Sequence, residues 1–239
     1  MLKIIIIILI GAIAAFGFLF LQRNPRLPIP LVTLRRDLQV DEWLRNPHAH
    51  PDWAVKDGQQ CSGAPFLIPS SGFIGYLWDD SFHAGHRHQG IDIFGSLPSG
   101  QTPVIAAYAG YLSRLKDWKA SLIIRVPRDP LEPTRQIWLY YTHLADASGY
   151  ISYILPEFPP ATREVKIEAG QLLGYQGNYS GYPNKPVGIH LHFSIIKDDE
   201  KGLYLNELNI ENTIDPSPYF ALPLDAYKNN ATLPVCNPP

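Results

Sequence analysis

Two histidines alternate with apolar residues in segment 188–193, which reads Gly-Ile-His-Leu-His-Phe. In an extended strand successive side chains point to opposite faces, so His190 and His192 share one face and the apolar residues between them pack on the other. Two unbonded imidazoles in so apolar a strand would cost stability. The pattern therefore favours metal-ligand or catalytic roles over a purely structural one.

A second run, residues 88–92, supplies another imidazole and a carboxylate, His88 and Asp92, four residues apart. Gly90 between them allows the backbone to turn or to approach another segment closely. Ligands of the His/His/Asp type leave one position of a tetrahedral zinc ion open, as in catalytic rather than structural sites. The two runs together therefore predict a catalytic zinc centre.

A further histidine, His143, ends an aromatic run that begins at Tyr140. Its role depends on whether the fold brings it beside His190. The tyrosines of this run, and Tyr76, could contribute a hydroxyl to such a site, although packing in the core or along a groove is the commoner use of a tyrosine.

The remaining histidines are expected to be solvated. His48 and His50 precede a proline in a segment that lacks β-branched residues. Neither His83 nor His86 is followed four residues later by an acidic residue, as His88 is by Asp92. For this second pair a position next to the metal ligands stays open as an alternative.

The composition narrows the class of protein. The 239 residues include 46% hydrophobic ones, and 20 basic against 22 acidic side chains give a net charge of -2. The chain lacks the basic surface of a nucleic-acid binder, and its length fits one or at most two domains. Oligomeric state cannot be read from it.

Only two cysteines are present, Cys61 and Cys236, and neither lies near the histidine motifs. A thiolate zinc site or a cysteine nucleophile is therefore not expected. The pair either forms a disulfide that ties the ends of an exported domain together or consists of two unrelated thiols.

An apolar run, residues 4–21, opens the chain. It is close to the length that crosses a bilayer and longer than the apolar part of a typical cleavable signal peptide, so residues 1–21 are predicted to form a transmembrane anchor. Four arginines within residues 23–36 favour an internal location under the positive-inside rule, but that rule weakens for long translocated domains. The cysteine pair and the chemistry favour a domain outside the cytoplasm.

Short apolar runs separated by Gly, Pro, Asp and Asn fill the rest of the chain and predict an all-β domain, an antiparallel sheet or sandwich, over residues 61–222. Residues 22–60 are expected to be a membrane-proximal linker with one short helix near residues 34–43, and residues 223–239 a tail. The long connection 146–168 is expected to be functional, as the wall or lid of a groove. The expected strands are 91–94, 104–115, 121–126, 137–144, 171–176 and 188–196.

Three of these segments resemble, in the same order, the signature of the lysostaphin-type zinc endopeptidases that cut bacterial peptidoglycan. They are residues 88–92, 141–144 and 190–193. Residues 103–110 and 168–177 resemble the family's strand after the first motif and its glycine-containing hairpin before the last. With the closing residues 215–219, the resemblance covers residues 72–220.

The resemblance implies a largely antiparallel β-sheet with a groove, one zinc ion held by His88, Asp92 and His192, and two catalytic histidines that are not ligands, His143 and His190. It implies peptidoglycan as the substrate. The turn before the last motif departs from the family pattern, because residues 178–187 are longer and contain two prolines. This departure leaves the ligands unchanged and puts the specificity of the groove in question.

Two other functions compete with an active endopeptidase. An inactive module of the same fold could bind the cell wall or activate another hydrolase, but such a module should have lost ligands that this chain keeps. A metal carrier or sensor on the membrane surface would not need His143. Zinc content and the effect of replacing His143 distinguish the three.

Overall fold

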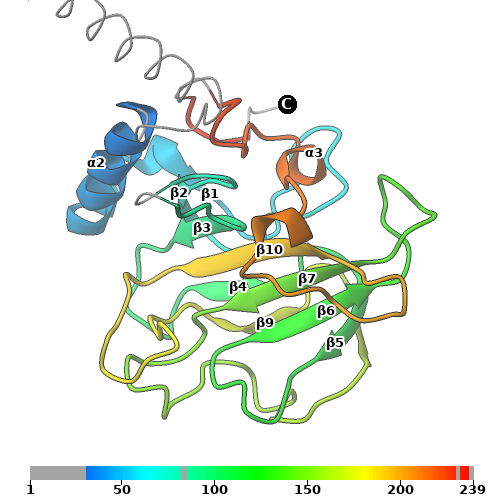
Figure 1. Ribbon diagram of the computed structural model, residues 1–239. Helices are drawn as coiled ribbons and strands as arrows, with labels where there is room; N and C mark the ends of the chain where they lie inside the picture. Colours follow the sequence, from blue (N-terminus) through cyan, green and yellow to red (C-terminus); the bar gives the residue numbers. More distant parts are fainter. Residues whose placement is uncertain (1–30, 82–84, 230–231, 237–239) are drawn as a thin grey trace, which may run out of the picture.

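The computed structural model of the protein describes residues 31–81, 85–229 and 232–236. Its main element is an eight-stranded antiparallel sheet with the order β1-β2-β3-β10-β7-β6-β5-β8, and a two-stranded antiparallel sheet pairs β4 with β9 (Figure 1). The predicted all-β class is confirmed. The strands are β1 Ala54–Val55, β2 Gly72–Tyr76, β3 Ile91–Phe94, β4 Pro103–Ile105, β5 Gly110–Ser113, β6 Leu122–Val126, β7 Ile137–Thr142, β8 Val165–Ile167, β9 Leu172–Tyr175 and β10 Leu191–Lys197.

The hydrophobic core lies between the two sheets. Ile93, Leu139 and Phe193 project from the central strands of the large sheet, and Val104 and Leu173 project from the small one; all five are fully buried. Since successive side chains of a strand alternate, the residues next to these in β3, β7 and β10 point to the opposite face. That face carries the candidate site.

Within the described residues the helices are few, and α2 is the longest of them. They are α2 Leu31–Arg45, α3 Ser217–Phe220 and the 3-10 turns η1 Pro47–Ala49, η2 Pro51–Trp53 and η3 Ile210–Asn212. The predicted short helix is confirmed as α2, and it extends beyond residues 34–43 at both ends. Its Val40 and Trp43 pack on Phe73 and Phe94 of the sheet, so this part of the expected linker lies against the domain. The division of the chain into anchor, linker, domain and tail stays a prediction.

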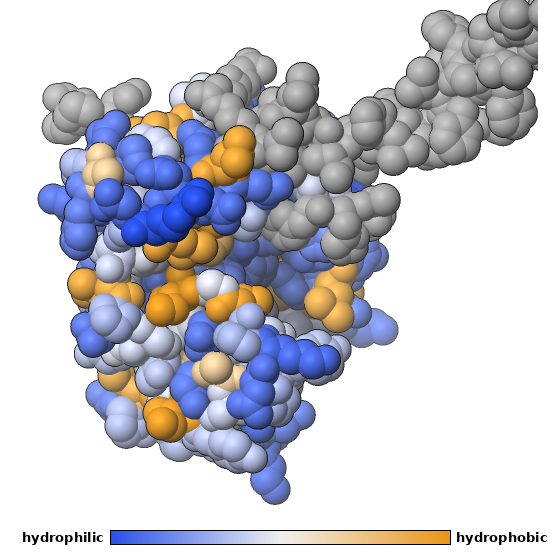
Figure 2. Space-filling view, turned by 90° about the vertical axis from the view of Figure 1, so that its left-hand side faces the viewer, coloured by the Kyte–Doolittle hydropathy of each residue, from blue (hydrophilic) through white to orange (hydrophobic). Residues whose placement is uncertain are grey.

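No helix within the described residues is long and apolar enough to span a bilayer. The predicted anchor, residues 1–21, lies outside them. On the side of the molecule seen in Figure 2, which is the left-hand side of Figure 1, hydrophobic residues form separate patches among hydrophilic ones.

One predicted strand is wrong. Residues 104–115 do not form a single strand, because the chain leaves the small sheet after β4 and enters the large sheet at β5. The turn between them is fixed by its backbone: Ala106 N–H donates to the Gln171 carbonyl, and the Ala106 carbonyl accepts from Gly170 N–H. The sequence pattern missed this break because the turn, residues 106–109, consists of three alanines and a tyrosine, which continue the apolar run.

The cysteines form the disulfide Cys61–Cys236, with their Cα atoms 5.2 Å apart. The predicted pairing of the two cysteines is therefore confirmed. The bridge closes a sequence separation of 175 residues and holds part of the tail on the domain, where Leu224 is fully buried and Asp225 pairs with Trp78.

Candidate metal centre and active site

The pairing of the central strands brings the predicted site residues together. In the ladder, His192 of β10 lies opposite Asp92 of β3 on one side and opposite Thr142 of β7 on the other. His143 follows β7 directly and His190 directly precedes β10. Neighbouring strands lie about 5 Å apart, so segments distant in sequence meet on one face of the sheet.

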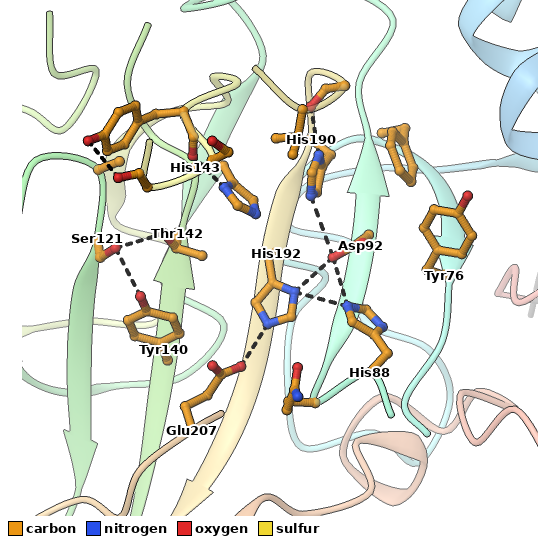
Figure 3. Close-up of a pocket in the computed structure, with 18 of the residues that line it drawn as sticks. Tyr76, His88, Asp92, Ser121, Tyr140, Thr142, His143, His190, His192 and Glu207 are labelled. Atoms are coloured by element: carbon orange, nitrogen blue, oxygen red, sulfur yellow. Dashed lines mark hydrogen bonds and ion pairs between the residues drawn. The ribbon is translucent and has the colours of Figure 1, made fainter. Parts of the chain in front are cut away.

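Three potential ligand atoms converge on one point (Figure 3). The Nδ1 atom of His192 lies 2.8 Å from Oδ1 of Asp92 and 3.0 Å from Nε2 of His88, and that Nε2 atom lies 3.1 Å from the same oxygen. All three side chains are buried. They form the one group of this kind among the described residues.

Hydrogen bonds on the far side of each ring decide which nitrogen faces this point. His88 donates from Nδ1 to the Leu77 carbonyl at 2.9 Å, and His192 donates from Nε2 to Oε1 of Glu207 at 2.9 Å. A neutral imidazole carries one proton, so each ring then turns a lone pair inward. Such partners orient histidine ligands in metal sites.

The arrangement fits a divalent cation. Two imidazole lone pairs and a carboxylate oxygen would repel one another unless a positive charge lay between them, and this donor set is one that zinc prefers. Burial would raise the pKa of Asp92, but electrostatic attraction to the imidazoles of His88 and His190 and hydrogen bonds from His192 and His88 hold it well below its usual value. Burial lowers the pKa of His192, yet its hydrogen bonds to Asp92 and Glu207 raise it to about 10. Both shifts show that this point of the site favours a positive charge.

The two candidate catalytic histidines lie beside this group (Figure 3). His143 donates from Nδ1 to the Tyr179 carbonyl at 2.6 Å, and His190 donates from Nδ1 to the Gly188 carbonyl at 2.7 Å. Their ring centroids are 4.5 Å apart. His143 has a φ of 71°, a strained value for a residue with a Cβ and one that is common at functional sites.

Burial and neighbouring imidazoles keep both of these rings neutral. Burial, followed by electrostatic repulsion from the imidazoles of His190 and His192, lowers the pKa of His143 to about 3. Burial also lowers the pKa of His190, although Asp92 opposes the shift. At neutral pH both imidazoles therefore carry a lone pair on Nε2, and Nε2 of His190 lies 3.6 Å from Oδ1 of Asp92.

The hydrogen-bonded carboxylate Glu207 was missed by sequence reasoning. It lies in the loop after β10, and its side chain is 16% exposed. No local pattern could have identified it, because its position depends on how that loop folds back over the sheet.

The three tyrosines differ in position. Tyr76 and Tyr140 line the cleft above the site, where Tyr76 donates to Asp37 of α2 at 3.0 Å and Tyr140 donates to Ser121 at 3.0 Å. Tyr141 is buried on the core face, where its hydroxyl accepts from Ala107 N–H. A role for Tyr141 in the site is thereby excluded.

The other histidines that the structure describes take no part in the metal group. His48 and His50 lie in and beside the 3-10 turn η1, and His50 stacks on Trp53. His86 is half-buried and its ring lies 6.5 Å from that of His88, so the expectation that it is exposed is only partly met. His83 lies outside the described residues.

The five predicted residues line a cleft of about 790 Å³. Its walls come from α2, the β5–β6 turn, residues 179–181 and 187–188, and the loop that contains Glu207. The longer turn 178–187 therefore borders the site. No residue of the connection 146–168 lines the cleft, and several line a neighbouring hollow instead.

Comparisons with known proteins give structural similarity only. No family model matches the chain, and no curated protein matches it. It is similar to the catalytic domain of the antimicrobial peptidase lysostaphin from Staphylococcus simulans, with 18% identity, a TM-score of 0.40, and coverage of 63% of this chain and 90% of that one. Against a longer lysostaphin chain, with 19% identity and a TM-score of 0.40, coverage is 70% of this chain and 54% of that one.

A third similar structure is a variant catalytic domain of the prophage-encoded M23 protein EnpA from Enterococcus faecalis. Its identity is 22%, its TM-score is 0.35, and the coverage is 64% of this chain and 96% of that one. The chain is thus similar in structure to lysostaphin-type peptidases. TM-scores of 0.40 and below carry no argument about activity, so the site itself must supply that argument.

Proposed function

We propose that the protein is a zinc-dependent endopeptidase that hydrolyses peptide bonds in bacterial peptidoglycan, in its stem peptides or cross-links. The observation that supports this most strongly is the convergence of His88, Asp92 and His192 within 3.1 Å of one another, beside the two neutral histidines His143 and His190. The order of the three sequence motifs supports peptidoglycan as the substrate.

When bound, zinc supplies a Lewis acid and lowers the pKa of a coordinated water. The protein supplies the groups that move protons. His143 and His190 present Nε2 lone pairs while their Nδ1 protons are held by the carbonyls of Tyr179 and Gly188. One of the two imidazoles accepts the proton of the attacking water at Nε2, and a protonated imidazole then donates to the leaving amine.

Digestion of purified sacculi tests the proposal directly. Full-length protein in detergent micelles should release soluble fragments with new amino and carboxyl ends, identified by mass, and should stop doing so when a chelator removes zinc. His143→Ala should abolish release while one zinc per chain is retained. Sacculi that stay intact with zinc-loaded protein would favour the inactive binding module instead.

We further propose that the domain is anchored by residues 1–21 and lies on the outer side of the cytoplasmic membrane, within the cell envelope. The disulfide supports this, because such bonds persist in oxidising compartments. Protease added to cells whose outer layers have been removed should digest a tag at the carboxyl terminus. Full protection of that tag would contradict the placement.

A further inference from the structure

A second hollow of about 390 Å³ lies beside the cleft. It is formed by the β5–β6 turn and by the connection 146–168, and it shares the stretch from Asp117 to Lys119 with the cleft. We call it the basic hollow. It is bordered by Arg114, Lys116, Lys119, Tyr150, Pro156 and Pro159.

Arg114 contributes a buried positive charge to the basic hollow, with 5% of the residue exposed. Its guanidinium donates to the carbonyls of Trp118 at 3.0 Å, Lys119 at 3.2 Å and Phe158 at 2.9 Å, and to the Ser152 hydroxyl at 3.1 Å. All four acceptors are neutral. A buried charge is usually paired with an opposite one, and this one is not compensated by any of its bonded partners.

The rim adds more positive charge. Lys116 and Lys119 are exposed at the edge of the basic hollow, and Asp117 is the one acidic residue that lines it. Three cationic side chains therefore face one carboxylate, in a chain whose net charge is -2. The hydrogen bonds of Arg114 to the β5–β6 turn and to the connection 146–168 explain why Arg114 is buried there. They do not explain why two lysines lie at the edge of the same hollow.

Lys119 also connects the basic hollow to the catalytic cleft. Its ammonium lies 5.5 Å from the ring centroid of Tyr150 and 5.7 Å from that of Tyr179, positions at which aromatic rings attract a cation. The carbonyl of the same Tyr179 accepts the hydrogen bond from His143. One residue, Tyr179, thus contacts both the candidate catalytic histidine and the lysine.

We propose that the basic hollow binds a carboxylate of the peptide substrate while the scissile bond lies in the cleft. The inference rests on the proposed endopeptidase function for its substrate, and the anion site itself can be tested without turnover. Arg114, Lys116 and Lys119 attract the carboxylate, and the apolar faces of Tyr150 and the prolines contact the chain that carries it.

The test uses two small probes that differ only in charge, N-acetylglycine and N-acetylglycinamide. Each is titrated into nitrogen-15-labelled full-length protein in micelles, and the resonances of Gly149 N–H and Arg114 Nε–H are followed, since these residues border the basic hollow and not the cleft. The acid should bind at least about threefold more tightly than the amide, the preference expected from partly exposed ion pairs.

Variants and a chelator identify the source of the preference. The exposed double variant Lys116→Met/Lys119→Met should lose the preference for the acid, whereas the matched control Lys201→Met, exposed and outside both linings, should keep it. Zinc is also a carboxylate ligand, so the titration is repeated after treatment with 1,10-phenanthroline, a neutral chelator. The preference should persist.

Equal binding of acid and amide would overturn the proposal, and so would a preference that survives in the double variant or disappears with zinc. The outcome is independent of the sacculus digestion. Digestion without any preference for the acid would refute the basic hollow alone. The expected preference without digestion would refute the endopeptidase function and leave an anion site.

Discussion

The carboxylate of Glu207 should control the affinity of the site for zinc. It accepts a hydrogen bond from Nε2 of His192 at 2.9 Å, and the two side chains are only 16% and 10% exposed. A hydrogen bond to a charged group contributes about 1.5–3 kcal/mol, which corresponds to roughly 10–100-fold in a binding constant, the usual range for such second partners of metal ligands.

Two substitutions separate the charge from the hydrogen bond. In Glu207→Gln an amide oxygen can still accept from Nε2–H, so the inward lone pair is kept and the charge is lost; zinc should bind about tenfold more weakly. In Glu207→Leu the N–H is left without a partner, and the loss should approach about 100-fold. Competition for zinc with a chromophoric chelator measures both values.

The matched control is Glu157→Gln, which removes an exposed carboxylate that lines neither hollow. Its zinc affinity should equal that of the unmodified protein. If Glu207→Leu bound zinc within twofold of the unmodified protein, the carboxylate would not orient His192, and the reasoning from ring tautomers would be refuted.

Three further predictions concern stability. Since the pKa of His143 is lowered to about 3 from an unfolded value near 6.5, its contribution to stability is present above pH 6.5 and is lost as pH falls. In urea unfolding, the unmodified protein should therefore lose up to about 2 kcal/mol more stability between pH 7 and pH 5 than the His143→Gln variant does. An added Cβ at Gly177 would lie 2.1 Å from the Ala145 carbonyl oxygen, so Gly177→Ala should destabilise by about 1–3 kcal/mol, and an unchanged urea midpoint would contradict the packing. Replacing Cys61 and Cys236 by Ser should lower the melting temperature, because the loop closed by the disulfide contributes up to about 5 kcal/mol to the free energy of unfolding. Dithiothreitol should lower the melting temperature of the unmodified protein but not that of this variant.

Alternation along a strand explains why much of the site could be predicted. His190 and His192 share a face because of their spacing alone, and β3 begins and ends at the predicted residues, Ile91–Phe94. No local pattern showed which strands are neighbours in the sheet. The position of His143 beside His190 therefore could not be predicted from local patterns. That depended on the resemblance of the ordered motifs.

Features that depend on tertiary path could not be predicted. Strand β2 contains two glycines, and Gly72 approaches Phe94 so closely that a Cβ would lie 2.1 Å from its carbonyl oxygen. Strand β8 is a mostly exposed edge strand with no alternating pattern. The contact of Trp43 in α2 with the sheet was also missed, because the segment around it is polar and rich in proline.

The number of zinc ions per folded chain, measured by native mass spectrometry, tests the central claim most directly. The unmodified protein should carry one zinc ion, His143→Ala should also carry one, and Asp92→Asn should carry much less under the same conditions. A protein that carries no zinc, or an Asp92→Asn variant that carries as much as the unmodified protein, would contradict the assignment of His88, Asp92 and His192 as ligands.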